Sequence, residues 1–163
     1  MVIEERRLEQ AQQKDADEVF ALYRRTVESG TSAWDDEYPG MQEIQFDLSE
    51  GGLYILREKG KIIAAVSIVD HDDLDEEPMD WSEGKSCALA RLCVEPQIQG
   101  QGIGKKMVES AMRLAKSLGY EWIRLLVDEK NGTAERLYQR LGFRKTGETD
   151  LYGSRFRAYE CRI

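Results

Sequence analysis

The residues best suited to chemistry lie in the segment 99–106, which reads QGQGIGKK and follows an expected strand. Glycine lets the backbone turn tightly, so that several backbone N–H groups can face one point. The first N–H groups of a helix have no partner inside the helix, and the helix dipole adds partial positive charge there. Lys105 and Lys106 add positive charge beside the turn. The segment therefore predicts a binding site for a pyrophosphate.

Two common phosphate-binding motifs do not fit this segment. The Walker A motif requires glycine at position 99 and Ser or Thr at position 106, which are Gln99 and Lys106 here. The dinucleotide motif GxGxxG requires glycine at position 105 or 107, which are Lys105 and Met107. Both motifs are excluded.

A second set of regularly spaced residues follows the next expected strand and comprises Asn131, Ala134, Tyr138, Gly142 and Phe143. Tyr138 shares one helical face with Ala134, Leu137 and Leu141, so its ring should point inward. A phenol has an ordinary pKa of about 10 and stays protonated at neutral pH, as a general acid must. The alternative is a core aromatic residue whose hydroxyl makes one hydrogen bond.

The segment Gln99-Gly100-Gln101-Gly102-Ile103-Gly104 matches the motif (Gln/Arg)-x-x-Gly-x-(Gly/Ala) between a strand and a long helix. Together with the second motif it resembles the GNAT superfamily of acetyl-CoA-dependent N-acetyltransferases, over residues 87–143. The resemblance implies acetyl-CoA as co-substrate, no metal, and Tyr138 as the acid that protonates the leaving thiolate. The residues that it places at the acetyl-CoA are Leu92, Cys93, Val94, Gln99, Gly100, Gln101, Gly102, Ile103, Gly104, Lys105, Asn131, Ala134 and Tyr138.

The general base is not found by this resemblance. Many family members have a glutamate on the strand before the glycine loop, at the position that Ala88 occupies here. Glu83, Asp80 and His71 are upstream alternatives, and a chain of water molecules is another, but the acidic run around them is also typical of a solvated surface.

Cysteine and histidine indicate no other reactive centre. The chain has three cysteines, one histidine and no CxxC pair, which argues against a zinc site or a disulfide framework. Cys93 lies centrally on the expected cofactor strand and could form a covalent acetyl-enzyme. Without a paired histidine, however, the role of a small buried hydrophobic residue is favoured. Arg91 on the same strand is expected to pair with an acidic neighbour.

The elements that position these residues follow from apolar periodicity. Helices are expected from Asp15 to Gly30 and over 41–49, 103–118 and 132–141, and strands over 2–9, 53–58, 61–70, 87–96, 122–128, 143–150 and 154–162. Their order predicts one mixed α/β sheet. The resemblance implies a single domain over 1–163 with a mostly antiparallel sheet flanked by helices and a central parallel strand pair at the cofactor site.

Composition limits the partners. The chain has 163 residues and a net charge of -8, which should repel nucleic acid and anionic membranes. The N-terminus lacks the apolar core of a signal peptide, and no apolar run approaches the length of a membrane-spanning helix, so a cytoplasmic location is expected. A homodimer is compatible with these properties.

The sequence leaves two functions open. The first is transfer of acetyl to a primary amine by direct transfer in a ternary complex, and the second is a non-catalytic regulatory module that binds acetyl-CoA. For the first, the acidic segments 70–83 and 31–38, with Trp34 and Tyr38, predict a small cationic amine or a peptide terminus as acceptor. The alternative is that both segments are solvated loops that keep the protein soluble.

Overall fold

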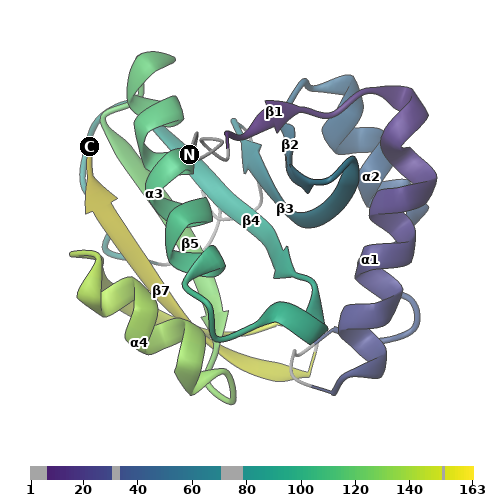
Figure 1. The fold of residues 1–163 in the computed structure, drawn as a ribbon. Helices are drawn as coiled ribbons and strands as arrows, with labels where there is room; N and C mark the ends of the chain where they lie inside the picture. The colour runs from purple at the N-terminus through teal and green to yellow at the C-terminus, as the bar shows by residue number, and fades with distance from the viewer. Residues whose placement is uncertain (1–6, 31–33, 71–78, 152) are drawn as a thin grey trace.

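A mixed sheet with helices on both faces forms the molecule (Figure 1). The computed structural model describes residues 7–30, 34–70, 79–151 and 153–163. The described strands are β1 (Glu9–Gln10), β2 (Leu53–Glu58), β3 (Lys61–Val69), β4 (Ser86–Val94), β5 (Trp122–Asp128), β6 (Arg144–Leu151) and β7 (Ser154–Arg162). The α-helices are α1 (Ala16–Glu28), α2 (Met41–Ser49), α3 (Ile103–Ser117) and α4 (Gly132–Arg140).

The strand order is β1-β2-β3-β4-β5-β7-β6. All neighbours pair antiparallel except β4 and β5, which pair parallel. A parallel pair needs a crossover, which α3 supplies between these two strands. The fold class predicted from the sequence, a mostly antiparallel sheet with one central parallel pair, is confirmed.

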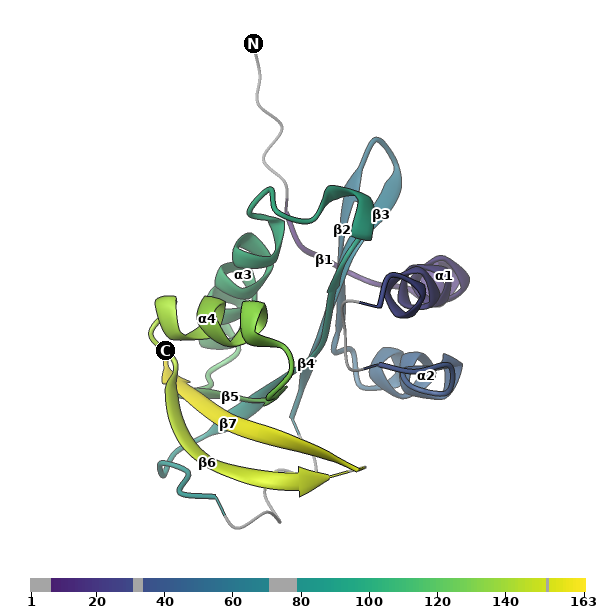
Figure 2. The same cartoon turned by 90° about the horizontal axis from the view of Figure 1, so that it is seen from below.

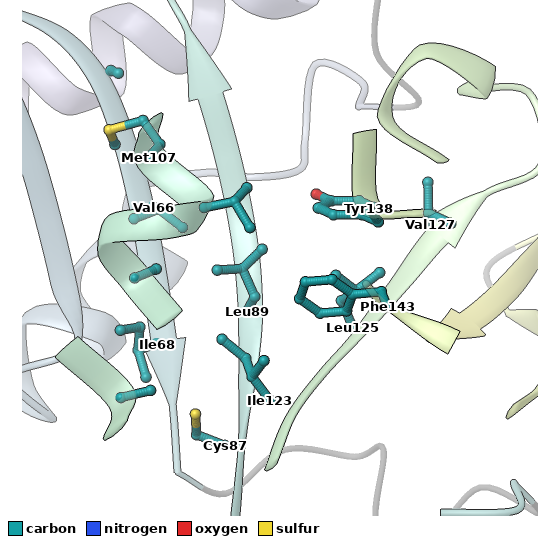
Figure 3. Packing of buried hydrophobic residues seen from close by; sticks show 14 of the residues in the cluster. Val66, Ile68, Cys87, Leu89, Met107, Ile123, Leu125, Val127, Tyr138 and Phe143 are labelled. Atoms are coloured by element: carbon teal, nitrogen blue, oxygen red, sulfur yellow. The ribbon is translucent and has the colours of Figure 1, made fainter. Parts of the chain in front are cut away.

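The helices form one layer on each face of the sheet. Figure 2 shows α1 and α2 on one side, over β2 to β4, and α3 and α4 on the other. The apolar stripe of α3 explains its placement, since Met107, Val108 and Ala111 lie in one buried cluster with the inner face of β4 and β5 (Figure 3). Burial of a large apolar side chain contributes roughly 1.5–3 kcal/mol, so these stripes dominate the stability of the layers.

Most expected elements agree with the structure within two residues, and the N-terminal strand does not. Only Glu9 and Gln10 pair with β2, while Arg7 and Leu8 lie outside any strand and residues 1–6 are not among those described. The strand expected over 87–96 ends at Val94, because Pro96 begins a short 3-10 turn that leads into the glycine loop.

Strand β4 contains a bulge in the middle of the sheet. Ala65 of β3 pairs with Cys93, whereas Ser67, two residues further, pairs with Ala90, so β4 has one extra residue between them. Arg91 lies at the bulge with φ of 49°, a conformation that costs free energy for a side chain other than glycine. The bulge changes which side chains face which helix layer: Leu89 packs in the cluster with α3, and Cys93 in the cluster with α1.

Strand β6 forms one edge of the sheet and is bordered by charged side chains. The carboxylate of Glu148 accepts from Lys145 Nζ at 2.7 Å and from Arg155 Nη2 at 2.9 Å. Arg155 also contacts Asp150 at 3.1 Å, and a register shift occurs between Lys145 and Gly147. Charges of both signs therefore alternate along this hairpin.

Candidate functional site

The site is built where β4 and β5 separate. The two strands pair only from Ser86 and Trp122 to Ala88 and Arg124, although β4 continues to Val94. Figure 3 shows the strands diverging beyond Cys87 and Ile123, with Tyr138 on the α4 side of the opening and its hydroxyl directed towards β4. Separation of the strands leaves backbone groups of both without a partner in the sheet, so a ligand could bind them.

The glycine loop has the open geometry expected of an anion site. Gly100 and Gly102 have φ of 85° and 79°, and Gly102 is the N-cap of α3. A Cβ atom at either glycine would meet no other atom within 4 Å, so the space above the loop is open. Gln101 and Lys105 are exposed, and Ile103, 2% exposed, fixes the first turn of α3 in the core.

The loop is held against both β4 and α4. Gln99 Nε2 donates a hydrogen bond to the carbonyl oxygen of Val94, with an N···O distance of 3.2 Å. A Cβ atom at Gly104 would lie 3.8 Å from Leu137 and 4.0 Å from Val94, which is ordinary contact. Three further residues pack against the buried cluster that contains α3, namely Leu92, Val94 and Ala134. The structure therefore brings the two sequence motifs together.

Helix α4 begins at the second motif. Asn131 is its N-cap, and the side-chain Oδ1 accepts a hydrogen bond from the backbone N–H of Ala134 at 3.2 Å. The backbone N–H groups of the first helical turn lack partners inside the helix, and the asparagine side chain supplies an acceptor for one of them. The cap fixes the start of the helix, and this start in turn fixes the direction in which Tyr138 points.

Tyr138 is buried without a hydrogen bond. Its side chain is 6% exposed, its ring centroid lies 5.5 Å from that of Phe143, and the hydroxyl has no hydrogen-bond partner among the residues described. Burial raises its pKa above the ordinary value, because the phenolate would lose its hydration. A core tyrosine normally satisfies its hydroxyl. The free hydroxyl therefore favours a role towards a ligand over the core interpretation.

The side chain of Cys93 lies on the opposite face of the sheet from Tyr138. It is 4% exposed and packs in the cluster with α1. Burial raises the pKa of the thiol to about 12, so a thiolate nucleophile is disfavoured at neutral pH. The structure therefore supports the interpretation of Cys93 as a small buried hydrophobic residue. Of this residue, only the backbone can belong to the strand edge predicted to lie at the cofactor.

Arg91 has a partner that the sequence did not identify. Its guanidinium donates to both carboxylate oxygens of Asp47 on α2, at 2.8 and 2.6 Å, and to the hydroxyl of Tyr38 at 3.2 Å. Asp47 is 1% exposed and also accepts from Ser67 Oγ at 2.6 Å. Burial alone would lower the pKa of Arg91, but the bonds to Asp47 raise it. This network fixes the bulge of β4 to α2.

The alternatives for a general base gain no support. Ala88 lies on the face of the sheet opposite α3, since its neighbours Cys87 and Leu89 pack in the cluster with α3, and it has no ionisable group. Asp80 and Glu83 are exposed, and His71 lies outside the residues that the structure describes. Within those residues no group of three or more His, Cys, Asp or Glu side chains could hold a metal ion.

The aromatic residues of the loop before α2 make contacts of their own. Trp34 packs edge-on against Tyr23, with ring centroids 5.3 Å apart. Asp35 Oδ1 accepts from the backbone N–H groups of Glu37 and Tyr38, each at 2.8 Å. The acidic segment expected to border the acceptor is described only at its ends, since residues 71–78 fall outside the described ranges. No helix in the described part of the chain has the length and apolarity needed to cross a membrane.

Comparison with known proteins gives a consistent result. The sequence model of the Acetyltransferase (GNAT) family matches residues 16–143. Peptidyl-lysine N-acetyltransferase YjaB of Salmonella typhimurium is 28% identical over 146 residues, which cover 88% of this chain and 87% of that protein. Several other relatives are longer, and the matched segment covers only 41% to 44% of their length.

Two solved structures share the fold. A GNAT family acetyltransferase from Streptococcus agalactiae superposes with a TM-score of 0.81 at 20% identity, covering 100% of this chain and 98% of that one. The acetyltransferase yncA from Salmonella typhimurium, solved with acetyl-CoA, has a TM-score of 0.74 at 17% identity and covers 97% and 94%. Since the family model matches most of the sequence and the architecture agrees, this chain belongs to the GNAT family of acetyltransferases.

Proposed function

We propose that the protein transfers the acetyl group of acetyl-CoA to a primary amine by direct transfer in a ternary complex. The observation that carries the proposal is Tyr138, a buried side chain whose hydroxyl has no hydrogen-bond partner among the described residues and lies beside the separation of β4 and β5. The open glycine loop packs against the same helix. A binding module would need the loop, but it would gain nothing from a free phenol.

The chain's own groups account for each step. Backbone N–H groups of the loop 99–105 hold the pyrophosphate, and the strand edge 92–94 positions the thioester beside the bulge. The amine nitrogen forms the new C–N bond, and the C–S bond breaks as the carbonyl forms again. Tyr138 donates its proton to the departing sulfur and regains one from solvent, while the proton released from nitrogen also leaves to solvent. Backbone N–H groups stabilise the oxyanion.

The proposed site predicts that Gly104→Glu weakens acetyl-CoA binding by at least about tenfold, because a negative charge beside the loop would repel the pyrophosphate. Gly104→Ala is the matched control, since Gly104 has no positive φ and a Cβ there makes only ordinary contacts. Isothermal calorimetry on both variants provides the measurement. Equal affinity for the two variants would contradict the position of the pyrophosphate.

For the acceptor, we propose a cationic amine. Asp35, Asp36 and Glu37 precede α2, and the relative from Salmonella typhimurium is named as acting on peptidyl-lysine, whose side chain is a cationic amine. Acidic groups near a site attract cations, and salt weakens this attraction. The value of kcat/KM should therefore be higher for a cationic amine than for a matched neutral one, and the preference should shrink as salt is raised. A preference that does not depend on salt would show that these segments do not select the acceptor.

The proposed function itself is tested by free-thiol release from acetyl-CoA with a panel of amines, and by the mass of the acetylated product. Thiol release that depends on an amine is expected. Tight binding of acetyl-CoA without release in the presence of every amine would instead identify a non-catalytic module.

A further inference from the structure

A carboxylate oxygen of Asp128 is buried without a partner. Asp128 is 5% exposed, and its Oδ1 accepts a hydrogen bond from the backbone N–H of Lys130 at 2.8 Å. Oδ2 is buried and, among the described residues, has no hydrogen-bond partner. A buried charged oxygen without a hydrogen-bond partner is costly, so it calls for a partner from outside the described residues, such as a ligand or a water molecule.

The position of Asp128 follows from the register of the parallel pair. Ser86 of β4 is level with Trp122 of β5. Asp128 is six residues beyond Trp122 (128 − 122), and Leu92 is six residues beyond Ser86 (92 − 86). Asp128 therefore reaches the height of the β4 bulge, at the end of the sheet where the two strands no longer pair.

The face on which Asp128 lies follows from alternation along β5. Val127 packs in the cluster that contains Tyr138, and Leu126 packs with Ala88 on the other face. Asp128 shares the face of Leu126, because side chains two residues apart on a strand point the same way. This is the face that Ala88 shares, where the family glutamate is missing.

Within the part of the chain that the structure describes, the neighbouring strands supply no cation for the free oxygen. On β7, Phe156 is directly opposite Asp128. Arg155 is paired with Glu148 and Asp150, and Arg157 with Glu135. Arg124, on the same face of β5, stacks its guanidinium on the ring of Trp81 at 4.9 Å and donates to the carbonyl oxygen of Ser82 at 3.2 Å.

From these observations we infer that Asp128 binds the ammonium group of the acceptor and removes its proton, an inference that rests on the proposed function. Side chains cover Oδ2, so the acceptor must displace them to reach it. The ammonium N–H donates to Oδ2, its proton moves to the carboxylate, and the nitrogen lone pair then attacks the thioester carbon. The nitrogen loses its second proton to solvent as the C–S bond breaks and the amide forms. Asp128 returns the proton to solvent after the product leaves. Asp128 thereby replaces the glutamate that is absent at Ala88.

The test compares Asp128→Asn with the wild-type protein on two acceptors. Asparagine keeps the shape and can accept the bond from Lys130, but it has neither the charge nor the basicity of Asp128. With a primary alkylamine, which is protonated at neutral pH, kcat/KM should fall by at least about tenfold. With hydroxylamine, which is largely unprotonated at neutral pH, kcat/KM should change little. A merely structural role of Asp128 would lower both values equally.

Glu129→Gln is the matched control, because Glu129 adjoins Asp128 in the sequence and is exposed. It removes the same charge and should leave both rates unchanged. An acetyl-CoA affinity equal to that of the wild-type protein, measured by calorimetry, shows that Asp128→Asn is folded. If this variant does not fold, Asp128→Ser is used instead, because its hydroxyl can also accept the hydrogen bond from Lys130. Equal losses on both acceptors, or no loss, would overturn the role of Asp128 alone. Wild-type protein that acetylates no amine would overturn the proposed function and this role with it.

Discussion

Replacing Tyr138 by Phe is expected to lower kcat by roughly 100- to 10,000-fold, the range typical of removing a general acid. The change deletes one oxygen atom that has no partner in the described structure, so the ring contact with Phe143 remains. In the proposed mechanism the hydroxyl acts mainly when the thiolate leaves, so its loss should appear in kcat and leave the KM for acetyl-CoA nearly unchanged. Steady-state kinetics of thiol release measure both constants.

Tyr159→Phe is the matched control. Tyr159 is also buried, at 2% exposed, but its hydroxyl donates to Glu135 at 2.6 Å and accepts from Gln139 at 3.0 Å. This variant should lose stability while it keeps kcat, because its hydroxyl is part of the structure. An unchanged kcat in Tyr138→Phe across neutral pH would show that Tyr138 is a structural core residue and not the general acid.

The second large effect is expected from Asp47→Ala, which should destabilise the fold by about 3 kcal/mol. The substitution leaves Arg91, whose side chain is 12% exposed, as a charge without its bidentate partner, and it also removes the acceptor of Ser67 Oγ. For a chain of this length the loss corresponds to a decrease in Tm of roughly 6–12 °C. Thermal unfolding followed by circular dichroism measures it.

Two further variants separate the buried charge from a general loss of an ion pair. Glu148→Ala removes exposed pairs with Lys145 and Arg155 and should change Tm far less. The double variant Asp47→Ala with Arg91→Met removes the unpaired charge and should be more stable than Asp47→Ala alone. If the two substitutions instead lower stability additively, the pair does not act as a unit.

Local sequence patterns predicted much of the fold. The helix over 103–118 was predicted within a residue because apolar side chains recur at its period and Gly119 follows it. The strand 2–9 was wrong at Arg7 and Leu8, because a short apolar stretch at a chain end carries little information on pairing. Parallel pairing of β4 with β5 came from the resemblance, since a local pattern does not identify the neighbour of a buried strand.

The glycine loop and Tyr138 could be predicted as site residues because each belongs to a local motif. The partner of Arg91 was not found, since Asp47 precedes it by 44 residues and only the folded chain brings them together. The bulge at Arg91 was missed as well, because the residue there is not the glycine that usually marks positive φ. Asp128 could have been noticed as a carboxylate that ends the apolar strand WIRLLVD, but nothing in the sequence shows that one oxygen lacks a partner.

The charged edge strand β6 affects whether copies of this protein can associate edge to edge. A free edge can accept a strand from another molecule, and uninterrupted edges of this kind lead to aggregation. Here an incoming strand would have to pair across the register shift at Gly147 and displace the contacts of Glu148 with Lys145 and Arg155. The hairpin therefore acts as a barrier to continuous sheet growth, and it should keep the protein dispersed at high concentration.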